Sequence, residues 1–231
     1  MSEPGTDADD SLAAMGVLAE PLRRRLYRHV VGQGGDVTRA AAADAVGAQR
    51  TLVAFHLDKL VEAGLLEVAR AKVSGRDGPG SGRPAKLYRR AGREHSVQLP
   101  PRDYATAARV LAEAVLRDGA EGALHAAARE EGVRQGAALA PEERPAAVGG
   151  LARYLERHGY EPAPDPADPS VLRLRNCPFH ALAREYPPLA CGMNLELLRG
   201  VLEGAGAGGF TARMDPGKEG CCVAISKNNQ N

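Results

Sequence analysis

The sequence predicts a mainly α-helical protein with small β elements: a basic N-terminal part, a helical middle and a C-terminal α+β part that contains the cysteines. Three observations support this prediction. The chain of 231 residues is 44% hydrophobic but only 4% aromatic and has no Trp, so its core must be built from Ala, Leu and Val, which favours helices. Apolar residues recur at helical spacing through much of the chain. All four cysteines lie in its last quarter.

Charge is distributed unevenly along the chain. The net charge is +1, yet residues 20–95 carry +7, residues 1–19 carry −4 and residues 96–231 carry −2. A basic segment between two acidic ones indicates a module that binds a polyanion, attached to a part with another task. The N-terminus is acidic and polar, unlike a signal peptide, and no run of 18 apolar residues is present. We therefore expect a cytoplasmic protein with no membrane span.

The first helices follow from apolar spacing and from residues that begin or end helices. Four apolar residues recur every four positions, namely Leu18, Leu22, Leu26 and Val30. Pro21 suits the first turn of this helix, which is expected to run to about Val31. A second helix begins after Thr38, a good N-cap, and ends at Gly47. A third follows between residues 48 and 66, with an apolar face formed by Val53, Leu57, Leu60 and Val61.

Two short helices joined by a turn that contains Gly are typical of a helix-turn-helix, in which the second helix is the recognition helix. Its outward residues are expected to be Gln49, Arg50, Thr51 and Ala54, followed by His56 and Lys59. Gln and Arg form paired hydrogen bonds with base edges, and Thr reaches a phosphate or a thymine methyl group. The alternative is that these residues are only solvated.

A β-hairpin is predicted after the recognition helix. Leu66 and Val68 lie on the outgoing strand, and Leu87 and Tyr88 lie on the returning one. The glycine-rich segment between them is basic and includes Arg83 and Lys86. A hairpin in this position is a wing, whose cations contact flanking phosphates or the minor groove. A solvated loop is the alternative.

The strings "RTLVAFHLDKLVEAGLL" and "GRPAKLYRR" resemble those of ArsR-like winged-helix regulators, and most closely the SufR-type iron–sulfur repressors. The resemblance covers residues 15–95. It implies a dimeric bacterial transcription regulator, here a repressor, that binds a double-stranded DNA operator.

The middle of the chain is Ala-rich and is predicted to be helical. Ala107, Leu111 and Val115 form one stripe, which we interpret as part of a homodimer interface that would place two recognition helices one DNA turn apart. Packing of these helices within one chain is the alternative. The expected division of the chain is an acidic disordered tail (1–10), a winged helix-turn-helix (11–96), a helical linker and dimerisation segment (97–140), a sensor domain (141–226) and a disordered tail (227–231).

The cysteine spacing is C-x13-C-x29-C-C. Cys177 is expected at the end of a strand, Cys191 at the start of a helix, and Cys221 and Cys222 at a loop-to-strand junction. Residues at the ends of such elements can converge on one point. The absence of a Cys-x2-Cys pair excludes a zinc ribbon and a ferredoxin-type run.

Three interpretations of the cysteines remain open. The resemblance to SufR-type repressors implies an iron–sulfur cluster, either 4Fe-4S or 2Fe-2S, held by Cys177, Cys191 and either Cys221 or Cys222. The fourth ligand would be Cys222, His180 or a non-protein group. Alternatively, Cys177 and His180 form a C-x2-H pair that would complete a Cys3His zinc site with Cys191 and one residue of the doublet.

In the third interpretation no metal is bound. The cysteines would be buried core residues or a thiol switch, for example Cys177 with Cys191. The segment from "NCPF" to "CCVAIS" also resembles small sensor domains of the vinyl-reductase type, which implies a hydrophobic small ligand. An enzyme is not expected: His180 lies close to Cys177 in sequence, but no third orienting group or substrate-binding motif is present.

Overall fold

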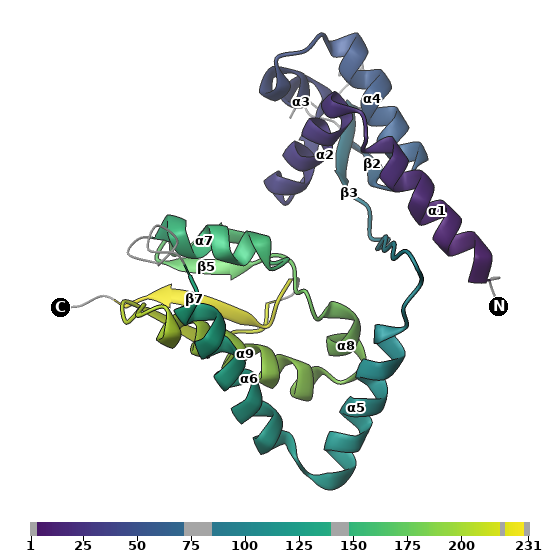
Figure 1. Cartoon of the computed structure of the whole chain (residues 1–231). Helices are drawn as coiled ribbons and strands as arrows, with labels where there is room; N and C mark the ends of the chain where they lie inside the picture. Colours follow the sequence, from purple (N-terminus) through teal and green to yellow (C-terminus); the bar gives the residue numbers. More distant parts are fainter. Residues whose placement is uncertain (1–3, 72–84, 140–147, 218–219, 229–231) are drawn as a thin grey trace. The chain divides into compact units, whose positions relative to one another are not determined.

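The computed structural model describes residues 4–71, 85–139, 148–217 and 220–228. The chain divides into two compact units, residues 1–102 and 103–231 (Figure 1). Both are mainly helical and each contains one small antiparallel sheet, which confirms the predicted fold class.

The N-terminal unit contains helices and a three-stranded sheet of order β1-β3-β2. Its helices are α1 (Pro4–Val17), α2 (Pro21–Gln33), α3 (Arg39–Val46) and α4 (Arg50–Glu62). Its strands are β1 (Val37–Thr38), β2 (Leu66–Ala71) and β3 (Ala85–Arg90). The β2–β3 hairpin pairs Leu66 with Arg90 and Ala71 with Ala85, so the predicted wing strands are confirmed. The wing tip, residues 72–84, lies outside the described residues.

The ends of α2 and α3 follow local chemistry. The Glu20 carboxylate accepts hydrogen bonds from the backbone N–H groups of Leu22 and Arg23, and Pro21 occupies the first helical position. The Thr38 hydroxyl accepts a hydrogen bond from the N–H of Ala41 and so begins α3. The helix ends at Gly47, whose φ of 65° is left-handed.

The start of the chain differs from the prediction. Residues 4–10, expected in a disordered tail, form the first turns of α1. Arg93 Nη2 lies 3.0 Å from Asp10 Oδ2, so an acidic residue of this segment pairs with a base that follows the hairpin. The next turn of α1 contributes Ala14, which is fully buried, to the core of the N-terminal unit.

The C-terminal unit combines further helices with a four-stranded sheet of order β4-β5-β7-β6. Its helices are α5 (Tyr104–Asp118), α6 (Glu121–Ala137), α7 (Val148–Arg157), α8 (His180–Glu185) and α9 (Pro187–Gly204). Its strands are β4 (Pro162–Pro164), β5 (Val171–Leu174), β6 (Phe210–Met214) and β7 (Val223–Lys227). The predicted α+β character of the cysteine region is therefore correct.

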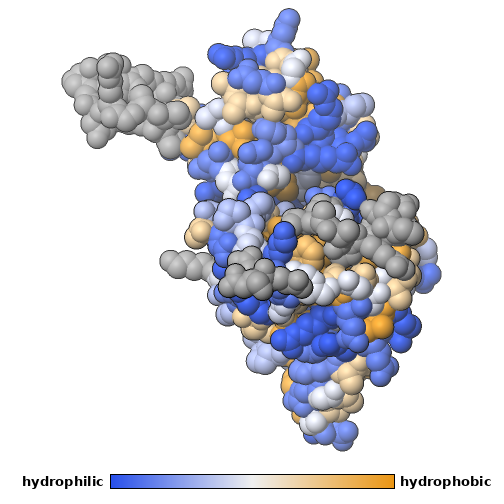
Figure 2. Space-filling view, turned by 90° about the vertical axis from the view of Figure 1, so that its left-hand side faces the viewer, coloured by the Kyte–Doolittle hydropathy of each residue, from blue (hydrophilic) through white to orange (hydrophobic). Residues whose placement is uncertain are grey.

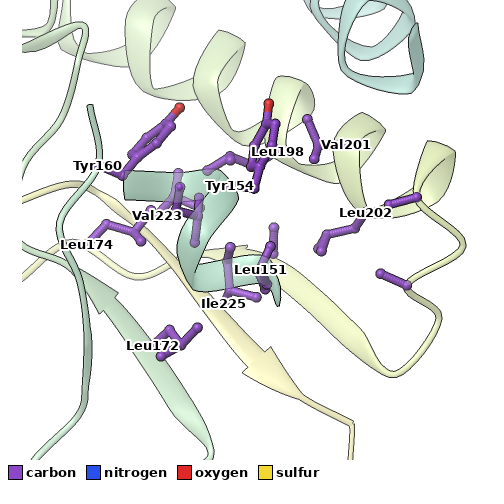
Figure 3. Close-up of a cluster of buried hydrophobic side chains, with 14 of the residues drawn as sticks. Leu151, Tyr154, Tyr160, Leu172, Leu174, Leu198, Val201, Leu202, Val223 and Ile225 are labelled. Carbon is purple, nitrogen blue, oxygen red and sulfur yellow. The ribbon is translucent and has the colours of Figure 1, made fainter. Parts of the chain in front are cut away.

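The core of this unit lies between one face of the sheet and two helices. Alternating residues of β5 and β7 face the core, because successive side chains of a strand point to opposite sides. Side chains of α7 and α9 cover them, as Figure 3 shows. The labelled members of this cluster are Leu151, Tyr154, Tyr160, Leu172, Leu174, Leu198, Val201, Leu202, Val223 and Ile225.

Helices α6 and α9 approach closely because glycines line their contact. A Cβ atom added to Gly132 would lie 2.1 Å from the carbonyl oxygen of Leu197, and one added to Gly200 would lie 2.1 Å from that of Arg129. Gly136 and Gly204 are equally confined. Arg129 crosses the contact to pair with two glutamates of α9. The expected separate linker, residues 97–140, is therefore not separate: α6 packs within the C-terminal unit, as the alternative interpretation proposed.

We expect Gly132→Ala to destabilise the protein by about 1–3 kcal/mol, because its methyl group would overlap the backbone of α9. Gly122→Ala, on the same helix but with no heavy atom within 4 Å of its added Cβ, should leave stability unchanged or raise it by about 0.5–1 kcal/mol. Urea unfolding of the two variants measures the difference. Equal stability of both variants would contradict the close helix contact.

Candidate functional site

The recognition helix α4 turns one side to the core and the other to solvent. Val53, Leu57 and Leu60 are fully buried. The predicted outward residues Gln49, Arg50 and Thr51 are exposed, and Ala54 and Lys59 are half-buried. The first turn of the helix, which reads base edges in helix-turn-helix proteins, is therefore accessible.

His56 does not face solvent as predicted. It is only 8% exposed, and its Nδ1 lies 3.6 Å from Glu20 Oε2. Burial alone would raise the pKa of Glu20, but the N–H groups of Arg23 and Leu22 outweigh it, so this pKa lies below its usual value. His56 is therefore buried against a capping carboxylate of α2 and does not face solvent.

Of the cations predicted to contact DNA phosphates or to support docking, Lys86 and Lys59 are paired with carboxylates of the same unit. Lys86 lies on β3, and its Nζ is 2.9 Å from Asp58 Oδ1 on α4. The Tyr88 hydroxyl also donates a hydrogen bond to Asp58 Oδ1, at 3.2 Å, so the wing strand is attached to the recognition helix. Lys59 pairs with Glu62 at 2.6 Å. Arg83 lies outside the described residues.

Two apolar residues of α4 were missed by sequence reasoning. Leu52 is 46% exposed and Phe55 is 56% exposed. Their apolar character alone suggests a core position. Helical periodicity does not, because the buried positions 53, 57 and 60 place Phe55 on the opposite side of the helix.

Figure 2 shows one face of the molecule, which is mainly hydrophilic with smaller hydrophobic areas.

The second candidate site contains the four thiols, which are free. Cys191 and Cys221 are buried, and Cys177 and Cys222 are half-buried. The thiol of Cys191 on α9 donates a hydrogen bond to Cys222, just before β7, with 2.8 Å between the sulfurs. Cys177 and Cys221 form a second interacting pair, in which each thiol shifts the pKa of the other. Three segments far apart in sequence thus bring their thiols into two pairs.

Two polar residues that the sequence did not single out support the thiols. Asn194 is 1% exposed, and its Nδ2 donates a hydrogen bond to Cys221 Sγ at 3.2 Å. Its Oδ1 accepts a hydrogen bond from the hydroxyl of Tyr160, which is 3% exposed. Asn194 follows Cys191 by three residues, so both lie on one face of α9.

The surroundings shift the thiol pKa values in opposite directions. The hydrogen bond from Cys221 lowers the pKa of Cys177 to about 7 against the effect of burial, with help from the backbone N–H of Phe179. The same hydrogen bond, together with burial, raises the pKa of Cys221. Burial and the neighbouring Cys222 raise the pKa of Cys191 to about 12. Cys177 is therefore the more readily ionised thiol of the second pair, and the pKa of Cys221 lies above its usual value.

His180 is not brought into the cysteine site. It is exposed at the first position of α8. Within the described part of the chain, no group of three or more His, Cys, Asp or Glu residues is arranged to hold a metal ion. The predicted C-x2-H pair of Cys177 and His180 therefore gains no support from the geometry.

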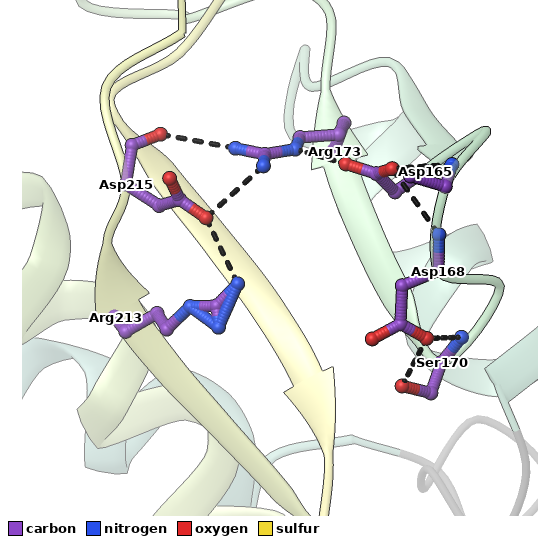
Figure 4. A network of polar contacts seen from close by, with 7 residues as sticks. Asp165, Asp168, Ser170, Arg173, Arg213 and Asp215 are labelled. Atoms are coloured by element: carbon purple, nitrogen blue, oxygen red, sulfur yellow. Dashed lines mark hydrogen bonds and ion pairs between the residues drawn. The ribbon is translucent and has the colours of Figure 1, made fainter.

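A separate polar network stabilises the far edges of the sheet (Figure 4). Arg173 on β5 pairs with Asp165 at 2.7 Å and with Asp215 at 3.1 Å. Asp215 also accepts a hydrogen bond from Arg213 on β6, at 2.9 Å. These charges satisfy one another, so the network joins strands and is not a candidate catalytic group.

A groove of about 740 Å³ lies along α6, the end of α9 and β6. Its cations are already paired: Arg129 with Glu196 and Glu203, and Arg199 with Glu196. Leu202 and Phe210 form its apolar wall. Ala207 and Ala212 extend this wall, so the hydrophobic ligand implied by the vinyl-reductase resemblance would find an apolar surface here beside paired charges.

Residues 18–69, from the start of α2 to β2, match a family model described as a helix-turn-helix domain, of the ArsR-like type. The match contains nothing specific to SufR-type repressors and does not reach the C-terminal unit. A search of curated proteins and a search of solved structures found no match. No helix among the described residues is long and apolar enough to cross a membrane.

We expect Cys177 to be the first thiol alkylated in metal-free protein, because the thiolate is the nucleophile and the pKa of Cys177 is about 7. Its rate with iodoacetamide should rise with pH and reach half of its maximum near pH 7. Cys191, with a pKa of about 12, should stay unmodified over this range. Peptide mass spectrometry after timed alkylation between pH 5 and pH 9 measures both rates.

The matched control is Cys221→Ala, which removes the hydrogen bond that lowers the pKa of Cys177. The midpoint for Cys177 should then move up towards about 8.5, the value of a free thiol. A midpoint that is the same with and without Cys221 would show that the pairing of these thiols is wrong.

Proposed function

We propose that this helix-turn-helix regulator senses a signal through its C-terminal cysteines, and that the sensing group is an iron–sulfur cluster. The helix-turn-helix match indicates a DNA-binding transcription regulator. The observation that supports sensing is the pairing of thiols in the other unit: Cys191 lies 2.8 Å from Cys222, and Cys177 interacts with Cys221. Among the described residues the thiols do not form a group of three that could already hold a metal ion. A regulator that needs cysteines only for its core has no reason to pair them.

The donor set suits an iron–sulfur cluster chemically. Cluster ligands are thiolates, and ligands must lose their protons before metal binds, as Cys177 does near neutral pH. Cys177, Cys191 and one of Cys221 and Cys222 would hold the cluster, which would supply a group that is lost or oxidised when oxygen or iron status changes. Asn194 would donate a hydrogen bond to a sulfur, a contact that tunes cluster potentials.

Metal binding through both Cys191 and Cys222 would require their sulfurs to move apart. The sulfurs of Cys191 and Cys222 lie 2.8 Å apart. Two thiolates on one tetrahedral metal, with bonds of about 2.3 Å, lie about 3.8 Å apart. If both thiolates bound one metal ion, the Cys191–Cys222 pair would have to separate by about 1 Å. If they bound different irons of a cluster, they would have to separate further, and Cys222 is half-buried.

The same short distance favours a second candidate, a thiol switch between Cys191 and Cys222. Their oxidation to a disulfide would transfer two electrons and two protons to hydrogen peroxide, whose O–O bond breaks to give two water molecules. This pair differs from the Cys177–Cys191 pair predicted from sequence. A Cys3His zinc site is the third candidate, and the exposed position of His180 is the argument against it.

On DNA, Gln49, Arg50 and Thr51 would read bases, since they are exposed at the start of α4. Lys59 and Lys86 would exchange their carboxylate partners for phosphates, and Arg83 would act from the wing. His56 is excluded from this set by its burial.

A homodimer remains our proposal for the assembly. The stripe predicted on α5 is largely uncovered: Leu111 is 66% exposed and Ala107 is exposed, while Val115 is half-buried. Tyr104 and Val110, at 67% and 61%, enlarge the apolar face. In a dimer with a two-fold axis, the apolar face of α5 in one copy would pack against the same face of α5 in the other copy.

Protein purified without oxygen should show a broad absorption band in the blue and contain iron and sulfide in equal amounts. Replacing Cys177 or Cys191 by Ser should remove the iron and the sulfide. Of the adjacent residues Cys221 and Cys222, one Ser variant should lose the iron and sulfide and the other should retain them. Colourless protein with stoichiometric zinc would replace the cluster with a zinc site. Metal-free protein that forms a Cys191–Cys222 disulfide with peroxide would establish the switch.

Sensing also requires a difference in DNA affinity between the two states. Coupling between sites is typically about 1–3 kcal/mol, or roughly 5–150-fold in affinity. The difference is measured by titrating a DNA duplex, selected for binding from a random library, with cluster-bound and with cluster-free protein. Equal affinities would leave a DNA-binding protein whose cysteines do not regulate it.

We expect Leu111→Asp to shift sedimentation at micromolar concentration from dimer to monomer and to weaken operator binding, because a charge would be buried in the α5 interface. Met214→Asp is the matched control: Met214 is 43% exposed on β6, away from α5 in sequence and fold. Wild-type protein that sediments as a monomer while binding its operator would refute the dimer.

A further inference from the structure

We propose that Phe55, assisted by Leu52, reads thymine methyl groups in the major groove of the operator. This inference rests on the proposed DNA binding of α4 and names the base that it selects. The sequence-based list of base-reading residues contained only polar side chains and Ala54, so it left the largest outward side chain of the helix without a role.

Phe55 lies near the centre of the outward face of α4. A helix turns by about 100° per residue, so the buried set Val53, Leu57 and Leu60 defines one side and Phe55 projects from the other. Thr51 lies one turn before Phe55 on the same side and is exposed as well. Leu52 flanks the pair at 46% exposure.

The residues around Phe55 hold its position rigidly. On one side His56 is buried against Glu20, the N-cap of α2. On the other side Asp58 is bound by Lys86 and Tyr88 of β3. The backbone on both sides of Phe55 is thus packed against the rest of the unit, which keeps the outward face of α4 in place, as base reading requires.

An exposed apolar side chain by itself needs no explanation, since single ones are common on protein surfaces. Here two of them lie three residues apart on the helix that a helix-turn-helix inserts into the major groove. The same helix carries two cations: Lys59, half-buried, lies one turn after Phe55 on the same side, and Arg50, exposed, lies in the first turn. The N-terminal unit that carries this helix is the basic part of the chain, so its surface favours a polyanion over another apolar protein surface.

Thymine is the base with an apolar group on its major-groove edge, the C5 methyl. A phenyl ring or an isobutyl group gains from covering that methyl because both lose contact with water. Cytosine, adenine and guanine present polar atoms there, which the ring would leave without hydrogen-bond partners. Phe55 and Leu52 therefore select T·A pairs next to the bases read by Gln49 and Arg50.

The test uses the full-length protein and a duplex selected from a random library. Each thymine of that duplex is replaced in turn by deoxyuridine, which removes only the C5 methyl group. At one or two positions the wild-type affinity should fall about fourfold, the effect of losing one buried methyl group. Phe55→Ala should bind the original duplex about tenfold more weakly and be indifferent to deoxyuridine at those positions.

Three further variants make the result specific. Phe55→Leu should keep part of the deoxyuridine effect, because it keeps an apolar side chain. Arg50→Ala should bind more weakly but keep the full effect. Met214→Ala, which removes another exposed apolar side chain, should bind as the wild type does. Urea unfolding of each variant shows that the losses are not losses of folding.

The outcomes separate this inference from the proposed function. Selective binding with no deoxyuridine effect in the wild type, or an equal effect in Phe55→Ala, would overturn thymine reading while DNA binding stands. A change in sedimentation of Phe55→Ala with an unchanged deoxyuridine effect would assign the side chain to contact between copies. If no duplex is selected from the library, the proposed function fails and the inference fails with it.

Discussion

The close contact of α6 and α9 is the constraint on which the C-terminal unit depends. Gly132 and Gly136 face Gly200 and Gly204 so closely that a methyl group on any of them would overlap the other helix. Small residues permit this approach because backbone can then pack on backbone. The contact sets the position of α9, and with it Cys191, which must meet a residue that precedes β7. A thiol pair between a helix and a strand junction tolerates little movement of either.

In the N-terminal unit, the recognition helix α4 is positioned by side-chain contacts and not by a close contact between helix backbones. This helix is held on one side by the hydrogen bonds of Asp58 with Lys86 and Tyr88 of the wing strand. On the other side His56 is buried against the capping carboxylate of Glu20. Two of these residues had been expected on the DNA. Lys86 instead attaches the wing to the helix, and His56 is buried. The surface of α4 available for base reading is therefore smaller and more apolar than the polar residues alone suggested.

The two units divide the chemistry between them. The first carries the excess of positive charge and no cysteine, so its DNA-binding surface is independent of thiol chemistry. The second carries all four thiols, and its charges are largely consumed by internal pairs such as those of Arg129 and Arg173. Interactions between the thiols separate their pKa values: that of Cys177 is lowered and that of Cys191 is raised, so Cys177 is the better nucleophile of the two.

Sequence alone determined the features that depend on neighbours along the chain. Capping at Thr38 and Gly47, the apolar period through Leu57 and the hairpin after α4 are local, so their residues predict them directly. Only the tertiary structure decided the burial of His56, the inclusion of α6 in the C-terminal unit and the pairing of the thiols. Each of these depends on which surfaces meet, and residues such as Asn194 and Cys221, 27 positions apart, come together only when the helix and the sheet pack.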